Sequence, residues 1–276
     1  MKKRILRIAL VVVLILLTVW AIWDNQNLQR TDYTVTNSSL PQAFDGYRIV
    51  QISDLHNARF GKDNERLLEM IRAAQPDIIA ITGDLIDSRR TNVAVALQFA
   101  RDAMKIAPCY YVTGNHELRD EALEELLQGL EDAGVTVLRG DAVKLEKDGQ
   151  WIHLVGIDDP TLITNKSELY DAAVWQMLDR YQSNHYTLLL AHRPKTLEIF
   201  CDIGIDLVLT GHNHGGQVRL PWGGGVFASG EFFPEYDAGL FQKEGTAMVV
   251  SRGLGNSLIP LRINNRPEVV VVTLRK

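Results

Sequence analysis

Cysteine is scarce in this chain of 276 residues, which contains only Cys109 and Cys201. Neither lies in a Cys-x-x-Cys pair or a comparable spacing, so a metal centre built on thiolates is excluded. Both cysteines lie beside apolar runs, where a thiol behaves as a small buried hydrophobic group. We therefore expect two free buried thiols, with a single disulfide between them as the alternative.

Basic residues are also in short supply once the N-terminus is set aside. The whole chain has a formal charge of -5, but residues 1–30 contain five basic side chains and one acidic side chain. The other residues carry 24 basic and 33 acidic side chains, a balance of -9. Such a surface is poorly suited to following a nucleic-acid backbone, so we expect no nucleic-acid partner.

The chain also lacks internal repeats and low-complexity segments, and the glycines at 223–225 do not follow the pattern of a phosphate-binding loop. Apolar residues make up 46% of the sequence. This content is too high for a disordered chain and sufficient for one sizeable domain or two small ones.

A long apolar run lies at the N-terminus. Between Ile8 and Trp23 only Thr18 is polar, and residues 5–7 extend the run to nearly the roughly 20 residues that span a bilayer. The run ends with two tryptophans at 20 and 23, which suit an interfacial anchor better than the small-x-small site of a cleaved signal. We expect one transmembrane helix within residues 1–30, and a cleaved export signal is the alternative.

The basic residues Lys2, Lys3, Arg4 and Arg7 precede this run. Clusters of lysine and arginine stay on the cytoplasmic side of a membrane. The sequence therefore predicts a single-pass protein of the cell membrane whose main domain lies outside the cytoplasm.

Residues 31–46 are expected to form a linker with one short strand, and residues 47–276 a catalytic domain. From residue 48 to 133, strand-like runs alternate with helical patterns, which is typical of a parallel sheet with helices on its faces. The second half contains further strand-like runs but only two helical patterns, at 168–181 and 195–200. So many strands in one domain predict an α/β fold in which two β-sheets pack face to face with helices outside.

Five strand-like runs stop abruptly at side chains that can bind a metal. In open α/β sheets, ligands bind beyond the carboxyl ends of the strands, so these endings are expected to converge on one crevice. Five of the seven histidines lie there, which ordinary packing does not explain. The runs are 49–53 before Asp54 and His56, 78–83 before Asp84, 110–114 before Asn115 and His116, 188–191 before His192, and 207–211 before His212 and His214.

The chemistry of this set indicates a divalent metal site. Carboxylate, imidazole and amide ligands without thiolate suit manganese, iron, zinc, cobalt or magnesium. One ion would leave too many ligands, whereas two ions can each take three or four if one carboxylate bridges them. Two ions about 3.5 to 4 Å apart activate water as hydroxide and hold the oxygens of a displacement at phosphorus. The ligand set therefore predicts hydrolysis of a phosphoester.

The ordered blocks of this sequence resemble those of the calcineurin-like metallophosphoesterases. They are Asp54-x-His56, Gly83-Asp84, Gly114-Asn115-His116-Glu117, His192 and Gly211-His212-x-His214. Residues 215–221, 251–255 and 267–268 are similar to the bacterial membrane-associated branch of YkuE- and YaeI-type phosphodiesterases. Some members of that branch hydrolyse the pyrophosphate of UDP-2,3-diacylglucosamine. The resemblance covers residues 45 to 275.

This resemblance implies a two-sheet fold flanked by helices and a role for each site residue. One ion would be bound by Asp54, His56, Asp84 and His214, and the other by Asp84, Asn115, His192 and His212, with Asp84 as the bridge. His116 would not be a ligand but an acid that protonates the leaving oxygen or stabilises developing charge, which suits a pKa near 6.5. Asp87 would orient His116, and an exposed turn carboxylate is the alternative.

We therefore expect a hydrolase of phosphodiester or pyrophosphate bonds that acts on an envelope- or lipid-related substrate, because the anchor confines the site near a bilayer. Two alternatives are a catalytically idle metal-binding receptor or scaffold, against which the complete set with His116 argues, and a secreted nuclease of the same fold, which the charge of -9 disfavours. An aromatic segment after the last ligand is expected to line an acyl or nucleobase pocket, or to pack as a core of its own loop. It contains Trp222, Phe227, Phe232, Phe233, Tyr236 and Phe241.

Overall fold

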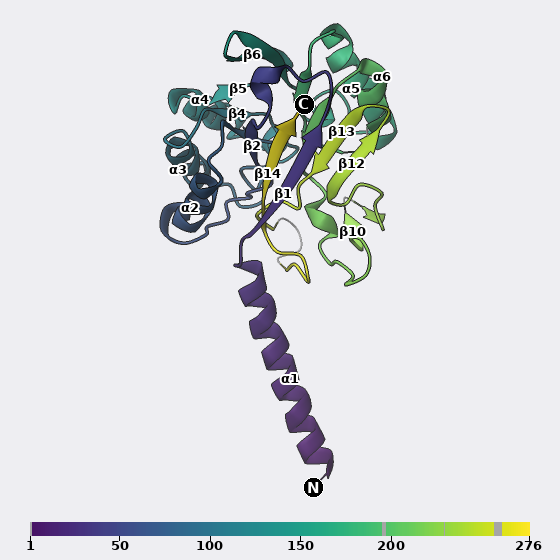
Figure 1. Cartoon of the computed structure of the whole chain (residues 1–276). Coiled ribbons are helices and arrows are strands. Elements are labelled where there is room, and N and C mark those ends of the chain that lie inside the picture. Colours follow the sequence, from purple (N-terminus) through teal and green to yellow (C-terminus); the bar gives the residue numbers. More distant parts are fainter. Residues whose placement is uncertain (1, 195–196, 229, 257–260) are drawn as a thin grey trace.

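The computed structural model describes residues 2–194, 197–228, 230–256 and 261–276. Figure 1 shows a domain of sheets and helices from which one long helix, α1 (Lys2–Asn25), projects. By length and composition α1 is able to cross a membrane. Most of its large apolar side chains are exposed, as expected for a helix whose apolar surface is not used to pack the domain.

The first sheet has six strands in the order β1-β14-β2-β3-β4-β5. Strands β2 to β5 are parallel, β14 is antiparallel to β2, and β1 is parallel to β14. The central strands are buried on both faces, which explains their continuous apolar runs. The strands are β1 (Gln29–Thr36), β2 (Arg48–Ile52), β3 (Ile78–Ile81), β4 (Cys109–Tyr111), β5 (Thr136–Val137) and β14 (Glu268–Arg275).

Strand β1 includes the short strand that was expected within the linker at residues 31–46. It begins at Gln29 and pairs with β14 along its whole length, from Gln29 opposite Glu268 to Thr36 opposite Arg275. The segment therefore belongs to the first sheet, and the domain boundary at residue 47 stays a prediction.

The second sheet has six strands in the order β12-β13-β9-β8-β7-β6. Its four central strands are parallel, and β6 and β12 are antiparallel edge strands. Neither β12 nor the small hairpin of β10 (Phe227–Ala228) and β11 (Glu231–Phe232) was predicted. The strands of the second sheet are β6 (Asp141–Lys147), β7 (Gln150–Gly156), β8 (Thr187–Leu190), β9 (Leu207–Thr210), β12 (Gly239–Lys243) and β13 (Thr246–Val250).

Three apolar layers hold the sheets and helices together. The layer between the sheets includes Ile49 and Val272 of the first sheet and Leu188 and Leu209 of the second. Two further layers lie between each sheet and its helices. Helices α2 (Glu65–Ala74), α3 (Val93–Ala103) and α4 (Leu123–Asp132) cover the first sheet, and α5 (Tyr170–Leu178) and α6 (Leu197–Ile203) cover the second. The predicted two-sheet α/β sandwich is confirmed.

Short 3-10 turns join several of these elements, and one of them carries a predicted ligand. They are Gln42–Phe44, Lys62–Asn64, Glu117–Arg119, Pro160–Leu162, Ser167–Leu169, Asp179–Tyr181 and His214–Gly216.

The two cysteines are free thiols, so the expectation of two free thiols is confirmed and the alternative of a disulfide is wrong. Cys109 is buried as expected, but Cys201 is only partly buried.

The direction of the strands places α1 at one particular end of the domain. Only residues 26–28 separate α1 from β1. Strand β1 runs away from α1, and β2, β3 and β4 run in the opposite direction, because β14 is antiparallel to β2. The carboxyl ends of these three strands therefore lie at the end of the domain to which α1 is attached (Figure 1).

Candidate metal centre

The loops that follow β2, β3, β4, β8 and β9 meet at this end of the sandwich, which we call the metal end. Backbone hydrogen bonds join neighbouring loops: the N–H of Asp54 donates to Gly83, and that of His56 to Asp84. Seven of the nine predicted site residues are buried, and His212 and His214 are partly buried. The convergence expected from the five strand endings is therefore present in the structure.

A first group of ligand atoms comes from Asp54, His56 and His214. The Nε2 atoms of the two histidines lie 3.2 Å apart. Asp54 Oδ1 lies 3.4 Å from His214 Nε2 and 3.9 Å from His56 Nε2. Asp54 Oδ2 is held on the other side by the Ser53 hydroxyl at 2.5 Å and the His212 N–H at 3.1 Å. Three potential ligand atoms thus face one small volume.

A second group is formed by Asp84, His192 and His212. His192 Nε2 lies 3.2 Å from Asp84 Oδ2 and 3.1 Å from His212 Nδ1. The other ring nitrogen of His192 donates to the Thr82 carbonyl at 2.8 Å, which orients the ring. Asp84 Oδ2 also lies 3.5 Å from His56 Nε2, so this one oxygen faces both groups.

Asn115 reaches the second group through an arginine that the sequence analysis did not single out. Arg193 Nη2 donates to Asn115 Oδ1 at 3.2 Å, and Nη1 lies 2.6 Å from His212 Nε2. Arg193 Nε donates to Asp159 Oδ2 at 2.7 Å. Arg193 directly follows His192 at the end of an apolar strand, and a charged residue at that position is the signal that could have identified it.

His116 lies against the first group. Its ring packs edge-on to that of His56, with centroids 4.6 Å apart. The Ser88 N–H donates to His116 Nδ1 at 3.1 Å, and Asp87 Oδ1 lies 3.4 Å from the same nitrogen. Asp87 is buried, so the alternative of an exposed turn carboxylate is wrong. His56, Asp87 and His116 together are also close enough to hold an ion.

The electrostatics of the cluster fit a bound cation. Burial raises the pKa of Asp54 to about 6 and lowers the pKa of His56 to about 4. Burial alone would lower the pKa of His192. The charge and hydrogen bond of Asp84, together with the charge of Asp54, outweigh burial and raise this pKa to about 10. Within the described residues, Asp54 Oδ1 is buried without a hydrogen-bond partner, a costly arrangement unless a cation binds there. The residues present therefore fit divalent metal ions.

The backbone at the metal end is strained. Five of the seven predicted ligands have a positive φ, a conformation that is uncommon outside glycine, although aspartate and histidine adopt it more often than most residues. Such strain costs on the order of 1–3 kcal/mol per residue and collects at functional sites. The five are Asp54 (53°), His56 (46°), Asp84 (53°), His212 (68°) and His214 (47°).

Glu117 and Gly114 fix the loop that carries Asp84. The buried Glu117 carboxylate accepts hydrogen bonds from the N–H groups of Asp84 at 2.9 Å, Ile86 at 3.1 Å and Gly114 at 2.8 Å. A Cβ atom at Gly114 would overlap the Asp84 carboxylate, so this close approach requires glycine. Glu117 belongs to the Gly114-Asn115-His116-Glu117 motif, but its role could not be predicted. Its hydrogen bonds to the N–H groups of Asp84 and Ile86 join segments that are distant in sequence.

A second unpredicted arginine, Arg262, supports His214. The side chain is buried and its Nη2 lies 3.0 Å from His214 Nδ1. Arg262 also donates to the carbonyls of Arg252 at 2.6 Å and Gly255 at 2.5 Å. Burial lowers the pKa of this guanidinium to about 10, which leaves it charged at neutral pH. Nothing in the sequence around Arg262 indicates this role.

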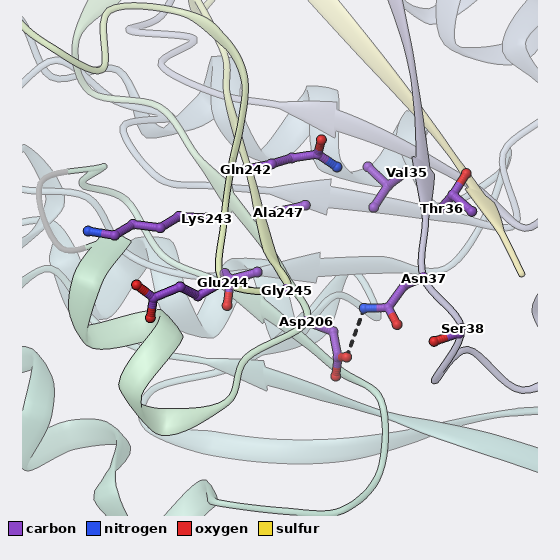
Figure 2. A pocket seen from close by; sticks show the side chains of 11 residues that line it. Val35, Thr36, Asn37, Ser38, Asp206, Gln242, Lys243, Glu244, Gly245 and Ala247 are labelled. Atoms are coloured by element: carbon purple, nitrogen blue, oxygen red, sulfur yellow. Dashed lines mark hydrogen bonds between the residues drawn. The ribbon is translucent and has the colours of Figure 1, made fainter.

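A cavity of about 420 Å³ lies at the opposite end of the sandwich, where β1 ends and β9 begins. Figure 2 shows Asn37 and Asp206 in its wall, joined by a hydrogen bond of 3.0 Å. Asp206 also accepts hydrogen bonds from the Ser39 hydroxyl and the Thr187 N–H. The carboxylate is therefore satisfied by the protein itself, in contrast to Asp54.

Comparisons with known proteins agree with this geometry. Among curated relatives, the uncharacterized metallophosphoesterase YkuE of Bacillus subtilis is 31% identical over 90% of this chain and 86% of that protein. Phosphodiesterase YaeI of Escherichia coli is 31% identical over 83% of this chain and 82% of that protein. A Danio rerio protein named as a transmembrane protein with a metallophosphoesterase domain is 29% identical over 96% of this chain and 62% of that protein.

The same fold occurs in a solved structure of a dimetal phosphatase from Danio rerio, with a TM-score of 0.50 and 16% identity over 76% of this chain and 88% of that one. The sequence profile described as calcineurin-like phosphoesterase matches residues 47–216. The predicted resemblance is confirmed, and the chain belongs to the calcineurin-like phosphoesterase family.

Proposed function

We propose that this protein is a dinuclear metal-dependent hydrolase of phosphodiester or pyrophosphate bonds. The observation that carries the proposal is the position of Asp84, whose Oδ2 lies 3.5 Å from His56 and 3.2 Å from His192. One carboxylate oxygen between two groups of imidazoles is the arrangement that a bridging ligand needs. The relative YaeI is named a phosphodiesterase, which supports a phosphodiester as the bond that this protein hydrolyses.

The ligands follow from the two groups. Asp54, His56, Asp84 and His214 would hold one ion, and Asp84, Asn115, His192 and His212 the other. Bound divalent ions, whether manganese, iron, zinc, cobalt or magnesium, would supply activation of water and neutralisation of the phosphoryl oxygens.

His116 is the proposed general acid. The Ser88 N–H can only donate, so its hydrogen bond to Nδ1 leaves the proton of the neutral ring on Nε2. As a general acid, His116 acts in the imidazolium form, in which Nδ1 is also protonated and faces Asp87 Oδ1. It gives the Nε2 proton to the leaving oxygen and is left as the neutral ring. Burial lowers the pKa of His116, while the Asp84 and Asp87 carboxylates favour the imidazolium form and oppose that shift.

Arg193 is proposed to bind a phosphoryl oxygen. Its guanidinium is buried beside Asn115 and His212, at the edge of the second ligand group. A fixed guanidinium pairs well with phosphate oxygens. Asp159 holds the side chain in place at 2.7 Å.

Helix α1 is proposed to anchor the domain to the cell membrane, with the domain outside the cytoplasm. Support comes from the length and apolar composition of α1, from the basic residues before it, and from a relative named as a transmembrane protein. An anchored site works at the membrane surface, so we propose an envelope- or lipid-related substrate.

Hydrolysis of bis(p-nitrophenyl) phosphate by the full chain in detergent, with manganese added, tests the enzymatic function. We expect turnover that a chelator abolishes and that fresh manganese restores. Turnover that persists in Asp84→Ala would contradict the assignment. Two bound ions without hydrolysis of any phosphodiester or pyrophosphate would instead favour the idle receptor.

A further inference from the structure

The turn before β10 and the segment that begins with β11 form loops that expose large aromatic side chains beside the metal centre. Trp222 is 86% exposed, Phe232 73% and Phe233 66%. Phe233 also holds φ at 53°, a strained conformation for a bulky residue. The Phe232 ring packs against Phe227, with centroids 5.1 Å apart. The exposure of Trp222 and Phe233 does not fit a loop that packs its rings into a core of its own. Large exposed apolar patches mark surfaces that bind a partner or a membrane.

These loops are continuous with the end of α1. The Asn25 amide donates to the Arg262 carbonyl at 2.8 Å, and Asn25 Oδ1 accepts from the Arg262 N–H at 2.8 Å. The next residue, Ile263, pairs with the segment at 217–219 through backbone bonds of 3.0 and 3.2 Å. That segment leads directly into the turn that carries Trp222. In Figure 1 the loops around β10 and the segment before β14 lie at the end of the domain that α1 joins.

The helix is fixed against this end of the domain. Asp24 is buried and pairs with Arg266 at 2.5 Å, and the Arg266 guanidinium lies 5.3 Å from the centre of the Trp23 ring. Ala21 is buried as well. Only three residues separate α1 from the first strand, so the domain has little freedom to turn its aromatic loops away from the base of α1.

We infer that these loops form an interfacial collar that docks on the bilayer in which α1 is embedded. The collar consists of the aromatic residues Trp222, Phe232 and Phe233 with the exposed aliphatic residues Leu220, Leu261 and Ile263. The inference rests on the proposed membrane anchoring of α1.

The chemistry of the collar matches the headgroup layer. Tryptophan and phenylalanine place apolar rings at the boundary between headgroups and acyl chains. The exposed carboxylates of Glu231 and Glu235 limit how deeply the loops enter, because charge is costly in hydrocarbon. His214, only six residues before Leu220, then faces the headgroups, and the site meets phosphoesters held in that layer.

A fluorescent label at position 223 tests the inference without removing any collar residue. Gly223→Cys introduces only ordinary van der Waals contacts with Leu220. The full chain, with Cys201→Ala to remove the partly buried thiol, is labelled and reconstituted into phosphatidylcholine vesicles with brominated acyl chains. We expect quenching at 223 and none at Ser38→Cys, an exposed matched site at the opposite end of the domain.

A third label, at Ile15→Cys in α1, separates this inference from the anchoring proposal. Quenching at 15 without quenching at 223 would overturn the collar and leave the anchor intact. Absence of quenching at 15 would overturn both. The combined change Trp222→Ser and Phe233→Ser should reduce quenching at 223 but not at 15, and an unchanged signal at 223 would count against the collar. None of these readouts depends on hydrolysis.

Discussion

The two ends of the sandwich differ in how their polar groups are satisfied. At the opposite end, a cavity of about 420 Å³ is lined by polar residues, and Asp206 is hydrogen-bonded by three partners from the protein. At the metal end, Asp54 Oδ1 has no such partner in the described parts of the chain, and imidazoles surround Asp84. A cluster of potential metal ligands with an unsatisfied carboxylate oxygen therefore identifies the functional site better than the volume of a cavity does.

Backbone strain shows the same contrast. Positive φ at the opposite end occurs at Asp148 and Glu244, each before a glycine in a hairpin turn, where it is commonly needed. It also occurs at Gln75, which ends helix α2. At the metal end it occurs at three histidines that belong to no such hairpin. The cost of these conformations is offset by the position they give to the ligand atoms.

Removing the bridge should have the largest effect. We expect Asp84→Ala to lose bound metal and hydrolysis together, because both ligand groups share this carboxylate. The matched change at the opposite end, Asp206→Ala, should lower the melting temperature but leave metal content and turnover unchanged. Elemental analysis and rate assays of both variants measure the contrast. Equal loss of activity in the two variants would remove the distinction between the two ends.

His116→Ala should slow hydrolysis by about 10²–10⁴-fold, the range of a lost general acid, while metal content stays nearly unchanged. The loss should be greater for an alkyl phosphodiester than for a nitrophenyl one, because a poor leaving group needs the proton more. Parallel rate measurements on the two esters check this. Since His56, Asp87 and His116 could also hold an ion, loss of a metal equivalent with equal loss on both esters would make His116 a ligand.

Glu117→Ala should act mainly on stability. It leaves three buried N–H groups without an acceptor, and each unsatisfied group costs about 1–3 kcal/mol. We expect a clear fall in the free energy of unfolding and a weaker affinity for metal, with Glu117→Gln retaining part of both. Denaturant unfolding and metal titration measure the two effects. A Glu117→Ala variant as stable as the wild type would show that the loop does not depend on these bonds.

Thiol modification should have the smallest effect. Burial raises the pKa of Cys109 to about 12, so this thiol stays protonated and unreactive at pH 8 in the native protein. Cys201 is partly exposed and should react first with iodoacetamide. Mass spectrometry after brief alkylation reads both sites, and turnover should not change. Activity lost in step with modification of Cys201 would connect α6 to the metal end.

The sequence predicted the sheets and the convergence of the ligands because both follow from local patterns. Apolar runs that end at Asp54, Asp84 or His192 indicate buried strands whose carboxyl ends carry polar ligands. The hydrogen bonds of Glu117 and Arg262 could not be predicted, because they join loops that meet only after folding. A short strand was expected within residues 31–46, but its place in the first sheet was not, because its polar sequence gives no sign of pairing with β14 at the other end of the chain.

The number of metal ions per chain tests the central claim most directly. After loading the full chain with excess manganese and removing unbound ions by gel filtration, elemental analysis should give two equivalents per chain, and His192→Ala should lose one of them. A wild-type stoichiometry that stays near one would contradict the bridging role of Asp84 and the dinuclear mechanism.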